Sequence, residues 1–245
     1  MSNSRAEQLS VLPFEQIDDW NQVIRQRFLA TAAIAKTVNF RAIAFGDLEL
    51  LFKLYDVLCF DNLFKRTMAG KVSFSFSPRM TSAGAKVMVF KNGLYRLTVS
   101  SHLLYQGFKE NAPPVTVNGV VCTDRLAVLQ RLVEHEMIHL YEFSLFGNSS
   151  CKQKRFKEIA LAKFGHPETT HRLVTVRQRA LTELNMRIGD KVTFEFDGKQ
   201  VSGFINRITK RATVLVLHPK GTLRDRQGNR YRRYYVPLRD LTKQA

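Results

Sequence analysis

The sequence is short of acidic residues, of cysteine and of long apolar runs. Its 245 residues contain 38 Lys and Arg but only 21 Asp and Glu, which gives a formal net charge of +17. The three cysteines are widely spaced and odd in number, so they do not suggest a disulfide framework and fit a reducing compartment. No uncharged run approaches the roughly 18 apolar residues of a membrane span, and the first ten residues are polar. We therefore expect a cytoplasmic protein that does not enter a membrane.

The positive charge is concentrated in the second part of the chain. Residues 1–151 hold 16 Lys and Arg against 13 Asp and Glu, a balance of +3, whereas residues 152–245 hold 22 against 8, a balance of +14. Such a field attracts polyanions, and nucleic acid is the most common polyanion that a cytoplasmic protein meets. The alternative is a generally basic, soluble surface.

Two histidines four residues apart form the most specific pattern in the sequence. His135 and His139 belong to a His-Glu-x-x-His motif inside an apolar stretch, residues 126–146. On a helix, residues four apart lie on one face, so both rings could hold one metal ion. Glu136 could take the proton of a water held by that metal. The motif predicts a zinc site with Glu136 as general base; the alternative is a pair of partly buried, hydrogen-bonded histidines.

The residues around the motif predict a helix. Thr123 and Asp124 offer an N-terminal cap and a negative charge in the first turn. Apolar residues then recur at steps of three or four: Leu126, Leu129, Val133, Met137 and Leu140. One stripe of this helix therefore belongs to the core, and the histidines lie on a neighbouring stripe.

The residues before this helix predict helices followed by strands. Residues 13–45 carry apolar residues spaced for an amphipathic helix, and a second helix is expected from Gly46 through Leu63. Residues 71–77, 86–90 and 95–100 are predicted strands separated by turn-forming residues, which indicates a small antiparallel meander. A second hairpin is expected around Asn118-Gly119.

The order of these segments resembles a known family. A helix with Leu54-Tyr55 and Phe60 precedes a strand segment with Ser77-Pro78-Arg79-Met80-Thr81, and then the histidine motif follows. Over residues 46–171 this resembles the SprT-like zinc metallopeptidases, which include the protease domain of Spartan, an enzyme that removes proteins crosslinked to DNA. The resemblance implies that His135 and His139 bind zinc, that Glu136 is the general base, and that a third histidine follows in a His-Gly-x-x-Phe segment.

The third ligand is where the sequence departs from that family. Counting back from Phe156, the family's His and Gly fall on Lys152 and Gln153. Cys151 is one residue earlier, at the predicted start of a helix that runs to Phe164, where the helix dipole would favour the zinc-binding thiolate. We therefore prefer Cys151. The alternatives are His166, His171 and Glu158.

The last sixty residues predict a different domain. Strands are expected at residues 191–196, 200–208, 212–217 and 231–236, and a single turn at residues 237–241. Five short elements in this length indicate a small barrel. The segments Ile188-Gly189-Asp190-Lys191-Val192 and Val201-Ser202-Gly203 resemble SH3-like barrels of the KOW or Tudor kind.

Basic residues in two segments are candidates for nucleic-acid binding. The helix after Cys151 contributes Lys152, Lys154 and Arg155, and the barrel contributes Arg224, Arg226, Arg230, Arg232 and Arg233. Three tyrosines alternate with these arginines and could stack on bases. Because Tyr231 and Tyr235 are expected to point into the barrel core while Arg230 and Arg232 point outward, binding is assigned to the arginines first.

Together these features predict an α+β protein in three parts. Residues 1–45 would be an N-terminal helical extension, residues 46–185 a zincin-like peptidase domain with helices on a small antiparallel sheet, and residues 186–245 a basic SH3-like barrel. The expected function is zinc-dependent hydrolysis of DNA-associated proteins. The alternative is a nucleic-acid-binding factor whose zinc site is structural and inert.

Overall fold

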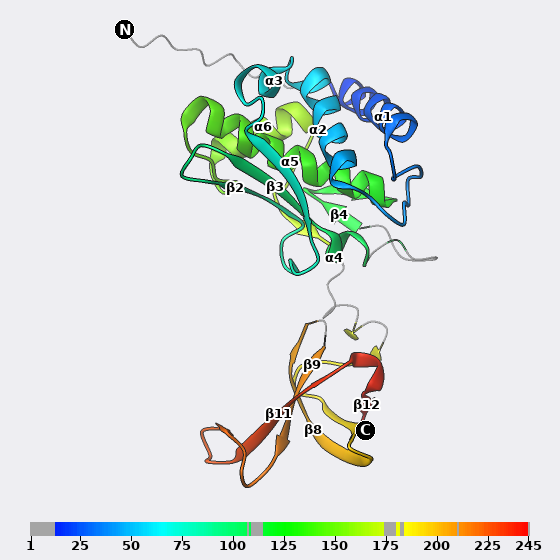
Figure 1. The fold of residues 1–245 in the computed structure, drawn as a ribbon, viewed down its shortest axis with the longest axis vertical. Coiled ribbons are helices and arrows are strands. Elements are labelled where there is room, and N and C mark those ends of the chain that lie inside the picture. Colours follow the sequence, from blue (N-terminus) through cyan, green and yellow to red (C-terminus); the bar gives the residue numbers. More distant parts are fainter. Residues whose placement is uncertain are drawn as a thin grey trace. The chain divides into compact units, whose positions relative to one another are not determined.

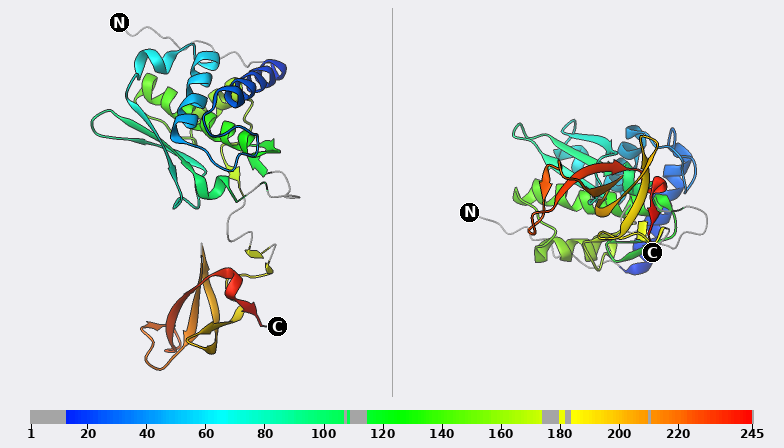
Figure 2. Two further views of the ribbon diagram at one scale, coloured as in Figure 1. Left: turned by 45° about the vertical axis from the view of Figure 1, so that its right-hand side comes forward. Right: turned by 90° about the horizontal axis from the view of Figure 1, so that it is seen from below.

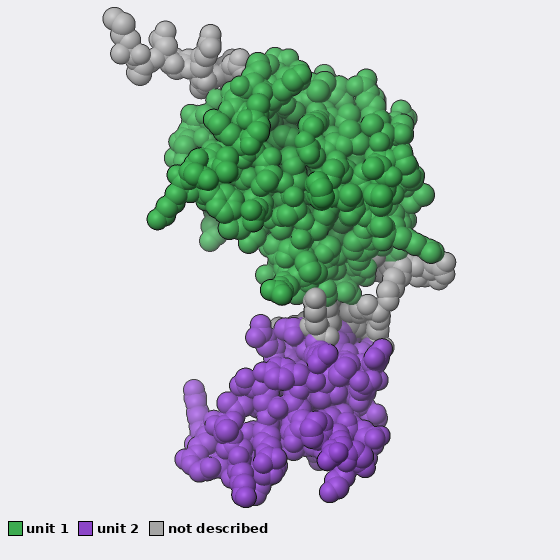
Figure 3. All heavy atoms as spheres, in the orientation of Figure 1, with its two compact units in different colours: residues 1–173 green, residues 174–245 purple. Residues whose placement is uncertain are grey.

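The structure, a computed structural model, describes residues 13–106, 108, 115–173, 180–181, 184–209 and 211–244. Two compact units divide the chain, residues 1–173 and 174–245 (Figure 3). The first twelve residues of the expected N-terminal extension lie outside the described residues. The domain boundaries expected after residues 45 and 185 remain predictions; Ala180 and Met186 both contribute to the core of the second unit.

Helices dominate the first unit (Figure 1). They are α1 (Phe14–Thr31), α2 (Phe45–Cys59), α3 (Leu63–Thr67), α4 (Ser101–Leu104), α5 (Arg125–Phe146) and α6 (Lys154–Phe164). The helix expected around the histidine motif is confirmed as α5. Its N-terminus is capped by the Asp124 carboxylate, which accepts a hydrogen bond of 2.9 Å from the Ala127 amide, and it ends at Gly147 with φ 69°. No helix in the described ranges is long and apolar enough to cross a membrane.

Two of the expected helices are shorter than predicted. α1 ends at Thr31, and α2 ends at Cys59 instead of continuing to residue 63. The interruption comes from Asp61 and Asn62, whose φ values of 49° and 56° are left-handed and stop helical hydrogen bonding. The buried Asp56 carboxylate then accepts two backbone amides at the start of α3, at 3.0 and 2.8 Å. The apolar periodicity did not reveal this break.

The three predicted strands form a mixed sheet, not the expected antiparallel meander. They are β1 (Val72–Ser77), β2 (Ala85–Val89) and β3 (Tyr95–Ser100), in the order β1-β3-β2. β3 is parallel to β1 and antiparallel to β2, so only the β2–β3 hairpin agrees with a meander. β3 takes the centre because its second half is fully buried, including Leu97 and Val99 at 0% exposure. β2 is therefore an edge strand, and α5 packs against it.

A second small sheet ties the end of the first unit to the hairpin before α5. β4 (Val115–Val117) pairs with β5 (Val120–Cys122) in the expected hairpin, and Asn118 and Gly119 form its turn with φ values of 53° and 80°. On its other side, β4 pairs with β6 (His171–Arg172). The hairpin at Asn118-Gly119 is thus confirmed, and it holds the segment that follows α6.

The second unit is an antiparallel sheet. Its elements are β7 (Lys191–Phe196), β8 (Lys199–Ile208), β9 (Ala212–Leu217), β10 (Leu223–Arg224), β11 (Arg230–Val236), η1 (Leu238–Asp240) and β12 (Thr242–Lys243). The strand order is β10-β11-β9-β8-β7-β12. Among the described residues no ladder joins β10 to β12, so the expected barrel is found only as an open sheet around its own apolar core.

The side-chain orientation predicted for β11 is wrong. Tyr234, not Tyr235, packs against the core, and Tyr235 is 60% exposed. Because side chains alternate along a strand, Tyr231 also points away from the core side, while Arg230 and Arg232 share the side of Tyr234. The sequence did not fix which half of the alternating pattern faces inward.

Candidate metal centre

Helix α5 places the two motif histidines together. Their ring centroids are 5.0 Å apart, as expected for residues one turn apart. Phe156 of α6 packs against both, with ring centroids 4.9 Å from His135 and 4.6 Å from His139. This ring shields both imidazoles from water, and burial lowers the pKa of His135 to about 3 and that of His139 to about 4. Both rings are therefore neutral at pH 7, the form that binds a metal.

Cys151 completes a cluster of three potential ligands. The chain turns back after Gly147, and the ligand atoms of His135, His139 and Cys151 lie within 4.8 Å of one another. With Zn–N near 2.0–2.1 Å and Zn–S near 2.3 Å, ligands around a tetrahedral zinc are about 3.4–3.6 Å apart, so a small contraction would close the site. Cys151 lies before α6, whose N-cap is Gln153, and so it is not in the first helical turn as expected.

The three alternative third ligands lie outside this cluster and each contacts another group, although within the described ranges the buried Nδ1 atoms of His166 and His171 have no hydrogen-bond partner. Nε2 of His166 is 2.7 Å from a Glu134 oxygen. Nε2 of His171 accepts a hydrogen bond of 2.9 Å from the Gly84 amide. Glu158 is exposed and lies 3.4 Å from the Lys154 ammonium. Of the four candidates, the described structure brings only Cys151 to the two motif histidines.

A buried hydrogen-bond chain fixes the orientation of His139. Its Nδ1 is 2.7 Å from the Ser149 hydroxyl, which donates to Glu142 at 2.5 Å. Because the Ser149 hydroxyl donates its proton to Glu142, it can only accept from His139. Nδ1 of His139 therefore carries the ring proton, and Nε2 keeps the lone pair that a metal needs. Arg155 balances the charge of fully buried Glu142 through a contact of 2.6 Å. The sequence pattern did not predict this series of hydrogen bonds, although Ser149 lies only two residues before Cys151.

Glu136 is buried but incompletely satisfied. It is 4% exposed, and its Oε2 has no hydrogen-bond partner. Burial raises its pKa to about 8, and a backbone hydrogen bond at Val87 of β2 offsets part of that rise. A buried carboxyl with a free oxygen is costly, and it lies one residue from His135. Its environment is that of a group prepared for a proton, a metal or a substrate.

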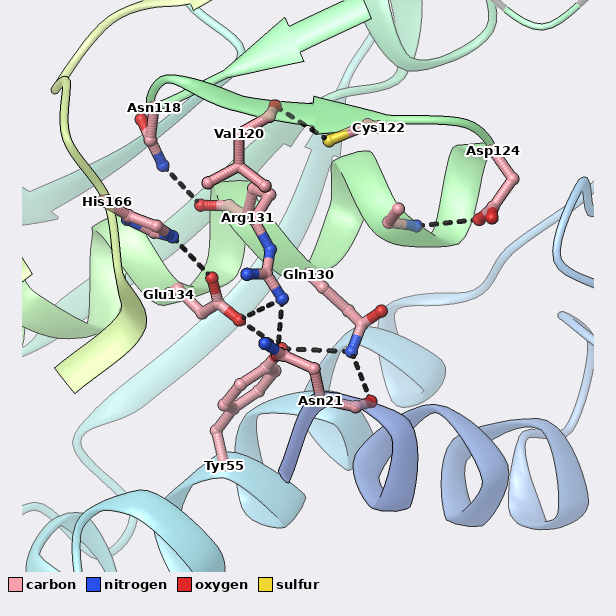
Figure 4. A network of polar contacts seen from close by, with 11 residues as sticks. Asn21, Tyr55, Asn118, Val120, Cys122, Asp124, Gln130, Arg131, Glu134 and His166 are labelled. Atoms are coloured by element: carbon pink, nitrogen blue, oxygen red, sulfur yellow. Dashed lines mark hydrogen bonds and ion pairs between the residues drawn. The ribbon is translucent and has the colours of Figure 1, made fainter. Parts of the chain in front are cut away.

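A second buried carboxylate, two residues earlier on α5, is fully occupied (Figure 4). Glu134 accepts hydrogen bonds from Tyr55 at 2.5 Å and from Arg131 at 2.8 Å, and contacts His166 at 2.7 Å. Asn21 of α1 contacts both Tyr55 and Arg131. This network joins α1, α2, α5 and the segment after α6, and therefore holds the helix that carries the motif. The spacing of Arg131 and Glu134, three residues apart on α5, was its only sequence signal.

The basic residues predicted to bind nucleic acid fall into two groups. In the first group, Arg155 forms an ion pair with Glu142 and Lys154 forms one with Glu158. Lys152, just before α6, is exposed. In the second unit the five arginines are exposed on or near β10 and β11: Arg224, Arg226, Arg230, Arg232 and Arg233. The structure keeps these arginines exposed, and their partner remains a prediction.

Comparison with known proteins gives the chain no relatives. No family model, curated protein or solved structure matches it. Function must therefore be argued from the geometry of the cluster.

Proposed function

We propose that this chain is a zinc-dependent peptidase that acts on proteins associated with DNA. The observation that carries the proposal is Glu136, whose buried Oε2 has no partner. A structural metal site would gain nothing from an unsatisfied carboxyl beside it, whereas a hydrolytic site needs a group that can accept and return a proton.

The donor set is compatible with zinc. His135 and His139 offer neutral imidazoles and Cys151 offers a thiolate, which are the ligand types that zinc prefers. Three protein ligands leave a fourth position open for water or substrate, as in catalytic zinc sites. The Ser149 contact holds His139 in the required tautomer.

Glu136 performs the proton transfers in this proposal. Bound zinc would supply Lewis acidity that lowers the pKa of water from roughly 15.7 to about 7 and polarises the scissile carbonyl. Glu136 takes the proton of the attacking water and returns it to the leaving amine. The pKa of about 8 describes the metal-free protein, in which this carboxyl is mostly protonated at pH 7; a bound cation would favour the carboxylate form that acts as the base.

Strand β2 supports a peptide substrate. It is a terminal strand of its sheet, and Val87 in its middle contacts Glu136. A free strand edge can pair with an extended peptide through backbone hydrogen bonds, largely independently of side-chain identity. The arrangement supports a zincin-like reading of the first unit.

The second unit supports delivery to nucleic acid. Its sheet, with the 3₁₀ turn η1 before the last strand, is compatible with an SH3-like barrel, and its exposed arginines suit phosphate contacts. Proteins held on DNA, including crosslinked ones, would then be cleaved by proximity rather than by a side-chain pocket.

The test combines zinc content with cleavage of casein and autocleavage, with and without single-stranded DNA. Three proteins are compared: the unmodified chain, Glu136→Gln, and Glu49→Gln as a control at a half-exposed glutamate of α2. We expect one zinc in all three, DNA-stimulated cleavage by the unmodified chain and the control, and a rate loss on the order of 10²–10⁴ in Glu136→Gln.

Two outcomes would contradict the proposal. Zinc binding without cleavage by any of the three proteins would favour a nucleic-acid-binding factor with an inert structural site. Cleavage that survives in Glu136→Gln would remove the assigned base.

A further inference from the structure

The first unit contains a long segment without acidic residues. From Asn62 to Lys109, 48 residues, there are eight Lys and Arg and no Asp or Glu. The charge count for the first half of the chain concealed this segment, because acidic residues on either side bring that half close to balance. Its strands β1, β2 and β3 form the mixed sheet beside the metal centre.

One face of this sheet is covered and the other is open. Phe74 packs against Phe52 of α2 with ring centroids 5.2 Å apart. Phe74 and Val87 both pair with fully buried Leu97, so this row faces the helices. Figure 2 shows the helices on one side of the sheet. Because side chains alternate, residues next to this row, such as Lys86 and Arg96, project from the opposite face.

The open face forms a basic groove of about 420 Å³. Three exposed cations line it, Arg79, Lys86 and Arg96. No acidic residue lines the groove, and within the described part of the chain none of these cations forms an ion pair. Ser75 and Thr98 add hydroxyls, whose oxygens are 2.9 Å apart. The groove therefore presents positive charge and hydrogen-bond donors without any neutralising carboxylate.

Apolar side chains lie among the cations. Met80, Met88 and Phe76 also line the groove, and Arg96 lies over the Phe90 ring at 5.1 Å from its centroid. Cations and hydroxyls suit phosphate oxygens, whereas methionine and aromatic surfaces suit the faces of bases. An acidic peptide would use only the first of these features.

We propose that this groove binds a single strand of nucleic acid. Pockets of roughly 300–1,000 Å³ hold molecules of drug size, so the groove would take one or two nucleotides of a strand at a time. The backbone of the same strand β2 contacts Glu136 at Val87, so a bound strand would bring attached protein close to the metal centre. The inference extends the proposed function, but its test does not require peptide hydrolysis.

The test measures binding of a fluorescent oligothymidylate to the full chain by anisotropy over a range of salt concentrations. Every protein carries Glu136→Gln, so that cleavage plays no part. The groove variant is Arg79→Ala/Lys86→Ala/Arg96→Ala. The matched control, Arg27→Ala/Lys36→Ala/Arg41→Ala, removes the same charges from exposed positions outside the groove.

We expect the groove variant to bind more weakly and to lower the slope of log affinity against log salt by about 2, since each phosphate contact on a single strand contributes about 0.7. The control should change the slope by less than about 0.5. Equal effects of the two variants would overturn the proposal, because the loss would then reflect net charge alone.

Photocrosslinking keeps the proposal testable if the groove variant does not fold. A 4-thiothymidine strand irradiated with the otherwise unmodified Glu136→Gln chain should crosslink to residues 72–100. Crosslinks confined to the second unit would overturn the proposal. A competition with polyglutamate gives a second contradicting outcome. If polyglutamate abolished the crosslinks to residues 72–100 at a concentration that left total oligonucleotide binding unchanged, the groove would be a site for acidic protein.

Discussion

Two glutamates on α5, only two residues apart, have opposite environments. Glu134 is fully buried and has three partners, Tyr55, Arg131 and His166. Glu136 is almost as buried, but one of its oxygens has no partner. The two glutamates have nearly the same sequence position and burial. They differ in the hydrogen-bond partners that neighbouring residues provide.

The comparison separates a structural carboxylate from a functional one. Glu134 is neutralised by Arg131 of its own helix and is also bonded by Tyr55 of α2 and His166 after α6, so its loss would affect several elements. Glu136 contacts the backbone of the edge strand β2 at Val87 and follows His135 directly in the sequence, and one of its oxygens stays without a partner among the described residues. An unsatisfied group persists because the surrounding packing holds it there.

The largest expected effect concerns Glu134, the glutamate with a complete set of partners. Glu134→Ala should lower the unfolding free energy of the first unit by about 3–5 kcal/mol, because it leaves Arg131 as a buried charge without its partner. Urea unfolding followed by Trp20 fluorescence measures this, since Trp20 is the only tryptophan and lies on α1. Exposed Glu158→Ala is the control and should change stability by less than about 0.5 kcal/mol. A loss below about 1 kcal/mol for Glu134→Ala would mean that the network around Glu134 does not stabilise the first unit.

The next effect has the opposite sign. In the metal-free protein, Glu136→Gln should raise stability by about 3 kcal/mol at pH 7, because the carboxyl has a pKa of about 8 when folded and an ordinary value of 4.5 when unfolded. The unfolded chain releases its proton first, so the unmodified protein loses stability as pH rises from about 4.5 to about 8.

Stability measured at pH 7 and pH 8 in the presence of a chelator checks this sign. The unmodified chain should become less stable over this interval, and Glu136→Gln should lose that part of the pH dependence. A destabilised Glu136→Gln would show that Glu136 is as structural as Glu134, and the contrast between them would fail.

The smallest expected effect concerns the shell around the histidines. Ser149→Ala should weaken zinc binding about 10-fold or more, because Nδ1 of His139 loses its acceptor and the ring loses its fixed tautomer. Competition with a chromophoric chelator measures the affinity. Ser144→Ala, which removes a hydroxyl bonded only to its own helix at Tyr141, is the control. Equal zinc affinity in both variants would show that the Ser149 contact does not support the metal.

Much of the candidate site could be predicted because its spacing is local. A repeat of four residues on a helix brings His135 and His139 together whatever the rest of the chain does. Thr123 and Asp124 marked where that helix begins, although Asp124 and not Thr123 is the cap. The hairpin at Asn118-Gly119 was equally predictable, since its left-handed turn suits these two residue types.

Other features could not be read from local pattern. Strand order in the mixed sheet depends on which strand is most buried, and the inward face of β11 depends on its register with β9. Summed charge also concealed the acid-free segment that forms the groove. These errors share a cause: periodicity shows that a face exists, but not what lies against it.

The sequence by itself determined the motif helix, the pair of histidines with Glu136 between them, and the basic character of the second unit. Helical periodicity and net charge depend only on the order and types of residues. Tertiary structure alone decided that Cys151 joins the histidines, that Glu134 is satisfied while Glu136 is not, and which sheet face stays open. Those outcomes depend on contacts between residues far apart in the chain, which no local spacing specifies.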